Sequence, residues 1–130
     1  MQKALIDTNL IIRFLLNDDP KKAIRVEELL SDKNNNYLIL DLVVAEIIWV
    51  LKSYYQFDKD LIIDKIKALI HLDSISCSKV LLDHALDIWE KNNVSYVDSY
   101  IIATAISENL KVYSYDLKFD KVNSVTRIEP

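Results

Sequence analysis

The chain alternates short apolar runs with longer segments in which apolar residues recur with helical periodicity. Short apolar runs of this kind are typical of strands that are buried on both faces of a parallel sheet. We expect such strands at residues 3–6, 37–40, 74–77 and 111–115, and a fifth at residues 125–128.

The segments between these runs predict helices, and several begin at recognisable capping residues. Asp19 followed by Pro20 is a strong helix start, since aspartate caps the free N–H groups and proline suits the first helical position. Asp41, Ser78 and Ser95 are expected to cap later helices in the same way. The predicted helices cover residues 9–16, 21–30, 41–56, 59–70, 79–91 and 95–109.

Strands that alternate with helices indicate an α/β fold with a parallel sheet covered on both faces. No linker, repeat or low-complexity segment divides the 130 residues, so we expect a single domain over residues 1–130. In parallel sheets, ligands bind beyond the carboxyl ends of the strands, and this edge is therefore where functional side chains are expected.

Composition excludes several classes of protein. Hydrophobic residues make up 51% of the chain, and it contains no glycine. It therefore lacks the phosphate loops, dinucleotide fingerprints and nucleophile elbows that depend on glycine. The single cysteine, Cys77, and the lack of a membrane-length apolar run favour a cytoplasmic protein without membrane association. A net charge of −4 argues against a broadly basic nucleic-acid surface. Trp49 and Trp89 are expected to anchor the core.

Two aspartates follow predicted strands. Asp7 comes directly after the first strand, and Asp116 comes directly after the strand at residues 111–115. Each also has a structural interpretation, because Asp7 can cap the next helix and Asp116 can form a turn. Both are nevertheless expected at the edge of the sheet where ligands bind.

Two further acids lie on predicted helices. Asp98 falls in the first turn after Ser95, where the helix dipole stabilises a negative charge. It also lies on an apolar stripe of the same helix. Glu46 is predicted to face the core, where an unpaired carboxylate costs several kcal/mol. A tertiary salt bridge or a wet cleft would also explain Glu46. Its neighbours three and four positions away are all apolar, namely Leu42, Val43, Trp49 and Val50.

A parallel sheet can bring these four carboxylates to one edge. Carboxylates that close together repel, and a bound divalent cation removes the conflict. Oxygen ligands without thiols or imidazoles favour Mg²⁺ or Mn²⁺ over Zn²⁺. A carboxylate-bound metal of this kind points to phosphodiester hydrolysis, and it explains how an acidic protein accepts a polyanion.

The same residues, in the same order, resemble the motifs of the PIN-domain ribonucleases. More narrowly, the chain is similar to the VapC toxins of bacterial and archaeal toxin–antitoxin pairs, over essentially its whole length. The motifs are Asp7-Thr8-Asn9, Glu46 within residues 43–51, Asp98 within residues 97–103, and residues 114–120 with Ser114 and Asp116.

This resemblance implies a three-layer α/β/α sandwich with a central, mostly parallel sheet of about five strands. It implies that Asp7, Asp98, Glu46 and Asp116 bind Mg²⁺ or Mn²⁺ and are catalytic. It implies orienting roles for Thr8, Asn9 and Ser114 around these carboxylates. It also suggests that Arg13 contacts a substrate phosphate, although an exposed helical arginine is an equal alternative.

The resemblance further implies an RNA substrate, a homodimer and a cognate antitoxin protein as partners. The family often carries glycine near Asn109, where asparagine can adopt the same left-handed cap. The function expected from the sequence is therefore a metal-dependent endoribonuclease, acting as a toxin.

Three alternatives remain open. An aspartate-nucleophile phosphohydrolase would carry a second aspartate where Asn9 stands. A receiver-like signalling module would need an aspartate after the third strand, where this chain has Ser76-Cys77-Ser78. The last alternative is an inactive PIN-like module that acts only through protein contacts.

Overall fold

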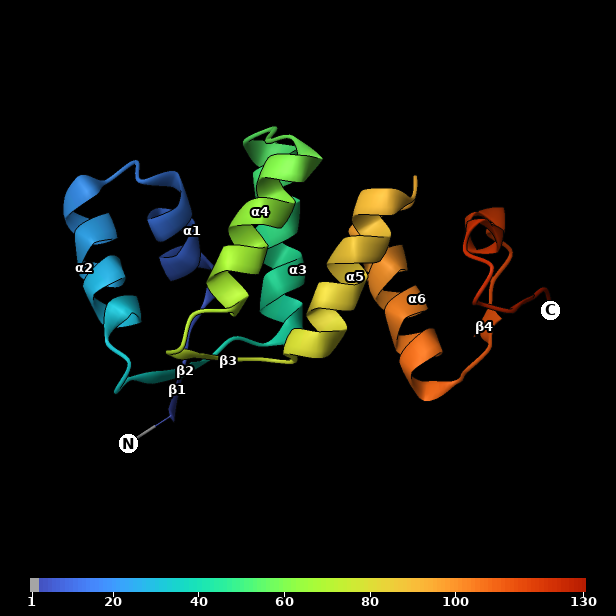
Figure 1. Ribbon diagram of the computed structural model, residues 1–130. Helices are drawn as coiled ribbons and strands as arrows, with labels where there is room; N and C mark the ends of the chain where they lie inside the picture. The colour runs from blue at the N-terminus through green and yellow to red at the C-terminus, as the bar shows by residue number, and fades with distance from the viewer. Residues whose placement is uncertain (1–2) are drawn as a thin grey trace. The chain divides into compact units, whose positions relative to one another are not determined.

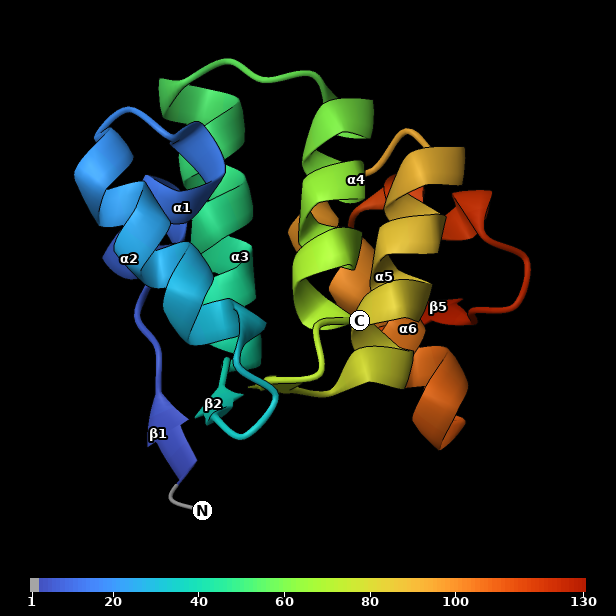
Figure 2. The ribbon, with the colours of Figure 1, turned by 60° about the vertical axis from the view of Figure 1, so that its left-hand side comes forward.

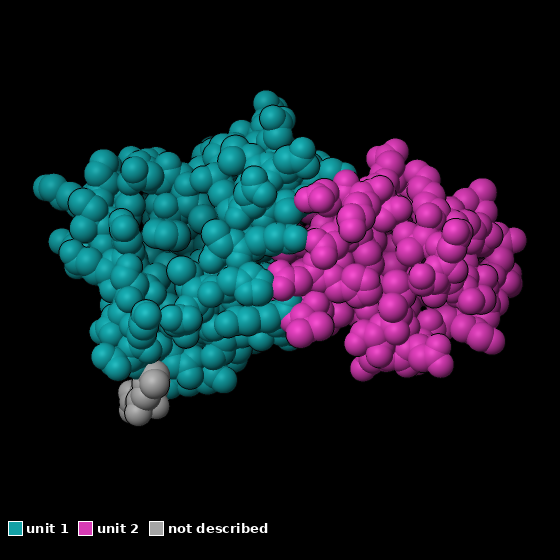
Figure 3. Space-filling view, in the orientation of Figure 1, with its two compact units in different colours: residues 1–79 teal, residues 80–130 magenta. Residues whose placement is uncertain are grey.

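The predicted strands form and pair in parallel, in two groups that belong to two units of the chain (Figure 1). The computed structural model describes residues 3–130. Unit 1 ends at Lys79 and unit 2 begins at Val80 (Figure 3). Each unit is described below by itself.

Unit 1 contains a three-stranded parallel sheet in the order β1-β2-β3. Lys3 of β1 pairs with Asn36 of β2, and Tyr37 of β2 pairs with Ile75 of β3. In Figure 1 the three strands lie at one end of the unit, below its helices. The strands are β1 (Lys3–Leu5), β2 (Asn36–Leu38) and β3 (Ile75–Ser76).

The helices of unit 1 connect these parallel strands, because a parallel pair requires a long crossover between its members. Two helices join β1 to β2 and two join β2 to β3, and Figure 2 shows α1 beside α2 and α3. The helices are α1 (Thr8–Leu16), α2 (Pro20–Ser31), α3 (Asp41–Trp49) and α4 (Lys59–Ile70).

Unit 2 contains a two-stranded parallel sheet and two long helices, the first of which begins at Lys79, the last residue of unit 1. A short 3₁₀ helix, η2 (Leu117–Lys121), lies in the crossover between the two strands, and Val112 pairs with Arg127. The helices are α5 (Lys79–Lys91) and α6 (Tyr96–Glu108), and the strands are β4 (Val112–Tyr113) and β5 (Arg127–Ile128).

The expected α/β class with parallel strands is confirmed, and all five predicted strands are present in shorter form. The expectation of one sheet of about five strands differs from the structure, which has a sheet of three and a sheet of two. In each hydrogen-bonded pair, the two strands belong to the same unit and follow one another along the chain, joined by one crossover.

Two helix starts and one helix end show how the sequence directs these boundaries. Asp19 caps α2 by accepting a hydrogen bond from the Lys22 N–H at 3.3 Å, with Pro20 in the first position, as predicted. Asp41 is the first residue of α3 rather than its cap, which is Leu40. The predicted helix to residue 56 continues past Trp49 as a wider π-helical turn, η1 (Val50–Tyr54).

The absence of glycine is compensated at three positions among residues 3–130. Asn17, Gln56 and Asn109 adopt positive φ angles of 52°, 56° and 54°. Asn17 and Asn109 end α1 and α6 in the left-handed conformation, which asparagine tolerates better than most residues. The predicted role of Asn109 as a left-handed cap is confirmed.

Buried aliphatic residues fill the interior, and one predicted core anchor is wrong. Trp89 is 1% exposed and its ring lies 5.7 Å from that of Tyr96 in an edge-on arrangement. Trp49, by contrast, is 65% exposed.

Within residues 3–130, the helices are all too short or too polar to cross a bilayer.

Candidate active site

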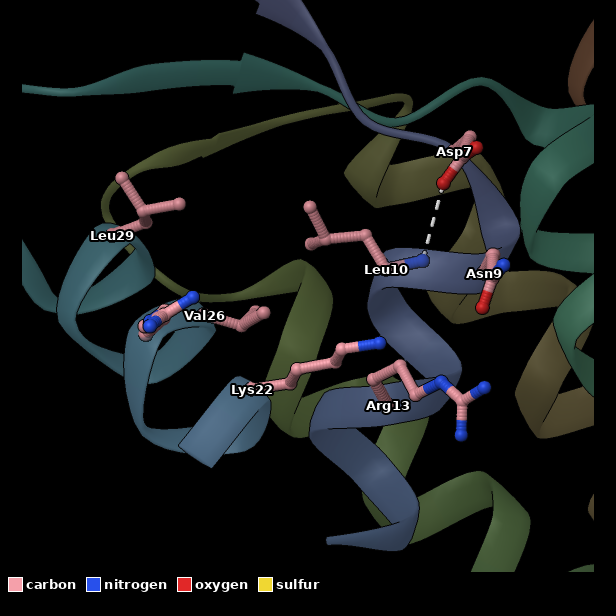
Figure 4. Close-up of a pocket in the computed structure, with 8 residues that line it drawn as sticks. Asp7, Asn9, Leu10, Arg13, Lys22, Val26 and Leu29 are labelled. Atoms are coloured by element: carbon pink, nitrogen blue, oxygen red, sulfur yellow. Dashed lines mark hydrogen bonds between the residues drawn. The ribbon is translucent and has the colours of Figure 1, made fainter. Parts of the chain in front are cut away.

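Asp7 lies just beyond β1, where the sequence predicts it, and it also caps α1. Its Oδ1 accepts a hydrogen bond from the Leu10 N–H at 3.1 Å (Figure 4). An ionised carboxylate has about four acceptor sites, so the cap uses only part of its capacity. The structural and functional interpretations of Asp7 are therefore compatible, because the cap fixes the side chain and leaves its other oxygen available.

The residues after Asp7 lie on the first two turns of α1. The side chains of Thr8 and Asn9 make no hydrogen bond to another residue in the described range, so their orienting roles stay predictions. Arg13 donates from Nη1 to Asp18 Oδ2 at 3.1 Å, and both side chains are 42% exposed. Exposed pairs of this kind contribute about 0.2–1 kcal/mol, so Arg13 can exchange this partner for a stronger anion.

The prediction that Glu46 faces the core is wrong. Glu46 is exposed, and so are Leu42 and Trp49 on the same face of α3, at 78% and 65%. The opposite face packs inward because it carries a second apolar stripe at the same spacing. The residues of that stripe are Val44, Ile47, Ile48 and Leu51, all buried.

Asp98 lies in the first turn of α6. Its N–H donates to Ser95 Oγ at 3.0 Å, which confirms Ser95 as the helix cap. The Asp98 side chain is half-buried beside the buried Val94 and Ile102. Its carboxylate makes no ion pair with any residue between 3 and 130, so it is free to bind a cation.

Asp116 follows β4 and caps η2, as its turn-forming interpretation predicts. Its Oδ1 accepts from the Lys118 N–H at 2.9 Å. Ser114 Oγ accepts from the Asp116 N–H at 2.9 Å, so Ser114 holds the backbone of Asp116. This places the hydroxyl next to Asp116, although the contact is to the main chain rather than to the carboxylate.

Asp120 differs from Asp116 because it has a cationic partner. Arg127 donates from Nε to Asp120 Oδ1 at 3.1 Å and from Nη1 to the Ser114 carbonyl at 3.0 Å. A weaker contact joins Arg127 to Glu129 at 3.4 Å. The hydrogen bond with Asp120 raises the pKa of Arg127 above its ordinary value, and the Glu129 carboxylate adds to the effect. Asp120 therefore has a structural role.

The four predicted carboxylates are divided between the units. Asp7 and Glu46 belong to unit 1, and Asp98 and Asp116 belong to unit 2. Within either unit, the described residues hold no group of three His, Cys, Asp or Glu side chains that would bind a metal ion. All four side chains carry the oxygen donors that Mg²⁺ and Mn²⁺ prefer, and none is paired with a cation of the described chain.

A hollow of about 430 Å³ between α1 and α2 begins at Asp7. We call it the basic groove, because three of its residues are cationic. Figure 4 shows Lys22 extending from α2 towards α1, and Leu10 pointing from α1 into the space between the helices. The groove is lined by Asp7, Asn9, Leu10, Arg13, Lys22, Arg25, Val26 and Leu29.

Lys22 and Arg25 are candidate functional residues that the sequence motifs do not single out. A signal is nevertheless present, because Lys22, Arg25, Val26 and Leu29 are spaced at i, i+3, i+4 and i+7 and so share one face of a helix. This spacing places two cations and two apolar residues on one face of α2. The sequence could not show that this face lies opposite Arg13.

Comparison with known proteins gives one match to a family. The family model described as the PIN domain matches residues 4–125, which include all four predicted carboxylates. No curated protein matches the chain.

Two solved structures align with nearly the whole chain at low similarity. One is VapBC2 from Rickettsia felis bound to a DNA fragment from the promoter, at 16% identity and a TM-score of 0.43, covering 99% of both chains. The other is a toxin–antitoxin complex from Klebsiella pneumoniae, at 18% identity and a TM-score of 0.35, covering 95% of both chains.

Proposed function

Because this chain belongs to the PIN-domain family, a family of nucleases, we propose that it is a Mg²⁺- or Mn²⁺-dependent endoribonuclease that hydrolyses RNA phosphodiester bonds. One observation carries the proposal. The four acids of the family motifs all fall inside the matched region, and none is neutralised by a cation of the described chain.

Asp7, Glu46, Asp98 and Asp116 are the proposed catalytic residues and metal ligands. A divalent ion held by these carboxylates supplies an activated water nucleophile and offsets the negative charge that builds on the phosphate. Asp7 and Asp116 are each fixed by a backbone N–H, at 3.1 Å and 2.9 Å. Little side-chain freedom is therefore lost when they bind a cation, which favours a preorganised site.

The neighbouring polar residues are proposed to orient this site. Thr8 and Asn9 follow Asp7 on α1, and Ser114 holds the backbone of Asp116 through a 2.9 Å hydrogen bond. Arg13 is proposed to contact a phosphate of the substrate. Its present partner, Asp18, is exposed, so a phosphate can displace it at little cost.

The biological role that we propose is that of a toxin. The ordered motifs resemble those of VapC toxins, which implies a cognate antitoxin protein, a homodimer and a cytoplasmic location. We also propose that residues 1–130 act together as one nuclease domain, because the family match runs through both units.

The test is incubation of the purified chain with total cellular RNA, with Mg²⁺ or with EDTA, alongside Asp98→Asn. This substitution keeps the shape of the side chain and the Ser95 cap, which uses the Asp98 backbone. We expect cleavage that requires Mg²⁺ and falls at least about 100-fold in the variant. Equal cleavage by both proteins would contradict the proposal. Turnover of a small phosphate ester without RNA cleavage would favour the aspartate-nucleophile phosphohydrolase.

A further inference from the structure

The basic groove between α1 and α2 has a composition that none of the roles above explains in full. We propose that it binds the single-stranded RNA substrate next to the site of cleavage, with Arg13, Lys22 and Arg25 contacting its phosphates. The inference rests on the proposed ribonuclease function and extends it by adding a substrate-binding surface.

The charges of the groove are available to a ligand. Lys22 Nζ lies 3.9 Å from Asp19, at the limit of an ion pair, and its side chain is 61% exposed. Arg25 has no hydrogen-bond or ion-pair partner among residues 3–130, and Arg13 holds only the exposed Asp18. Three weakly held cations therefore line one hollow of a protein whose net charge is −4. They match the charge of a nucleic-acid backbone.

The walls of the groove supply the apolar surface that a nucleotide-binding site needs besides its cations. Leu10, Val26 and Leu29 line the hollow, and Leu29 is 44% exposed. A hollow of about 430 Å³ lies within the usual range of small-ligand sites, about 300–1,000 Å³. Single-stranded RNA presents both phosphates and unstacked bases, so it fits a surface that combines cations with an apolar wall.

The position of the groove connects it with the proposed catalytic residues. Asp7 and Asn9 line the hollow together with Arg13. Arg13 lies one helical turn beyond Asn9, about 6 Å along α1. A strand that lies in the groove therefore extends from α2 to Asp7, and its bound phosphates precede or follow the one that is cleaved.

The test measures binding without cleavage. A fluorescein-labelled, 12-nucleotide single-stranded RNA is titrated in EDTA against the full chain and against Lys22→Gln, Arg25→Gln and Lys21→Gln, followed by fluorescence anisotropy. Lys21→Gln is the matched control, since it removes the same charge from an exposed position of α2 that does not line the groove. Circular dichroism checks that each variant is folded.

We expect Lys22→Gln and Arg25→Gln each to weaken binding about fivefold or more, and Lys21→Gln by less than about twofold. The slope of log K against log salt should fall by about 0.7 for each phosphate that a variant no longer neutralises. Equal weakening by all three variants would overturn the proposal, because it would reflect net charge alone. If Lys22→Gln and Arg25→Gln weaken the binding of an acidic, leucine-rich 12-residue peptide but leave RNA binding unchanged, the proposal is also overturned, in favour of a protein ligand.

The same variants separate this inference from the proposed function. If the unsubstituted chain cleaves RNA with Mg²⁺ while Lys22→Gln and Arg25→Gln bind it normally, the groove assignment fails and the ribonuclease assignment stands. If these variants lose binding but the unsubstituted chain never cleaves RNA, the groove assignment stands and the ribonuclease assignment fails.

Discussion

The two units each place an aspartate just after a parallel strand, but they use the nearby cations differently. In unit 1, Asp7 caps α1 next to the basic groove, where Lys22 and Arg25 are weakly held or have no partner in the described chain. In unit 2, Asp116 caps η2, and Arg127 is fully engaged by Asp120 and the Ser114 carbonyl.

The difference lies in whether the cations near the strand-end aspartate already have close partners. The Arg127 side chain is only 14% exposed and its three contacts lie within unit 2, so it holds β5 to the segment after β4. Arg13 and Lys22 of the basic groove stabilise unit 1 little, since the pair of Arg13 with Asp18 is exposed and that of Lys22 with Asp19 is long. The same local motif, an aspartate after a strand, therefore leads to different surroundings in the two units.

The largest expected effect tests whether the two strand-end aspartates are equivalent in catalysis. Asp7→Asn and Asp116→Asn should each lower Mg²⁺-dependent RNA cleavage about 100-fold or more, because a neutral amide is a poor ligand for a hard cation. Asparagine caps helices as well as aspartate does, so neither change should unfold its helix. Cleavage rates at saturating Mg²⁺ provide the measurement.

Asp120→Asn is the matched control for this pair, because Asp120 follows β4 as Asp116 does but is held by Arg127. Its cleavage rate should stay within about twofold of the unsubstituted chain, as expected for a residue outside the site. Normal cleavage by Asp116→Asn would show that only the strand end of unit 1 contributes to the site.

The next largest effect is on stability and is expected from a comparison of the two tryptophans. Trp89→Ala should lower the free energy of unfolding by about 3–5 kcal/mol, since it empties a fully enclosed site beside Tyr96. Trp49→Ala should lower it by less than about 1 kcal/mol, because the Trp49 ring is exposed. Urea unfolding followed by circular dichroism measures both.

Trp89→Phe keeps this comparison usable if the alanine variant does not fold, because it leaves most of the ring volume in place. A fall of several kcal/mol in the free energy of unfolding of Trp49→Ala would indicate that the exposed face of α3 is covered in solution.

The smallest effect concerns the positive φ angles in the glycine-free chain. Gln56→Gly should raise the free energy of unfolding by about 0.5–1 kcal/mol, since a residue with a long side chain is disfavoured at φ 56°. Asn109→Gly should change it by less than about 0.5 kcal/mol, because asparagine already tolerates this conformation. Thermal unfolding measures both, and equal gains would contradict this ranking.

Much of the fold was predictable because its signals are local. The cap at Asp19-Pro20, the cap at Ser95 and the left-handed end at Asn109 depend on residues within one helical turn, and all three form as predicted. The positions of Asp7 and Asp116 after their strands were predictable for the same reason.

The orientation of α3 was not predictable in this way. Glu46 shares a stripe with Leu42 and Trp49, while a second apolar stripe runs along the opposite face. Helical periodicity identifies two candidate buried faces in such a segment, and only packing against other elements selects one. The stripe predicted to be buried, with Glu46 and Trp49, is the one that faces outward.

The sequence by itself determined where the strands and helices begin, which acids follow the strands and which family the motifs resemble. Each of these depends on spacing along the chain. Only the tertiary structure decided that Lys22 and Arg25 line one hollow with Arg13, and that Arg127 is engaged by Asp120. These contacts join residues on separate elements, and their distances are set by packing rather than by any pattern within one segment.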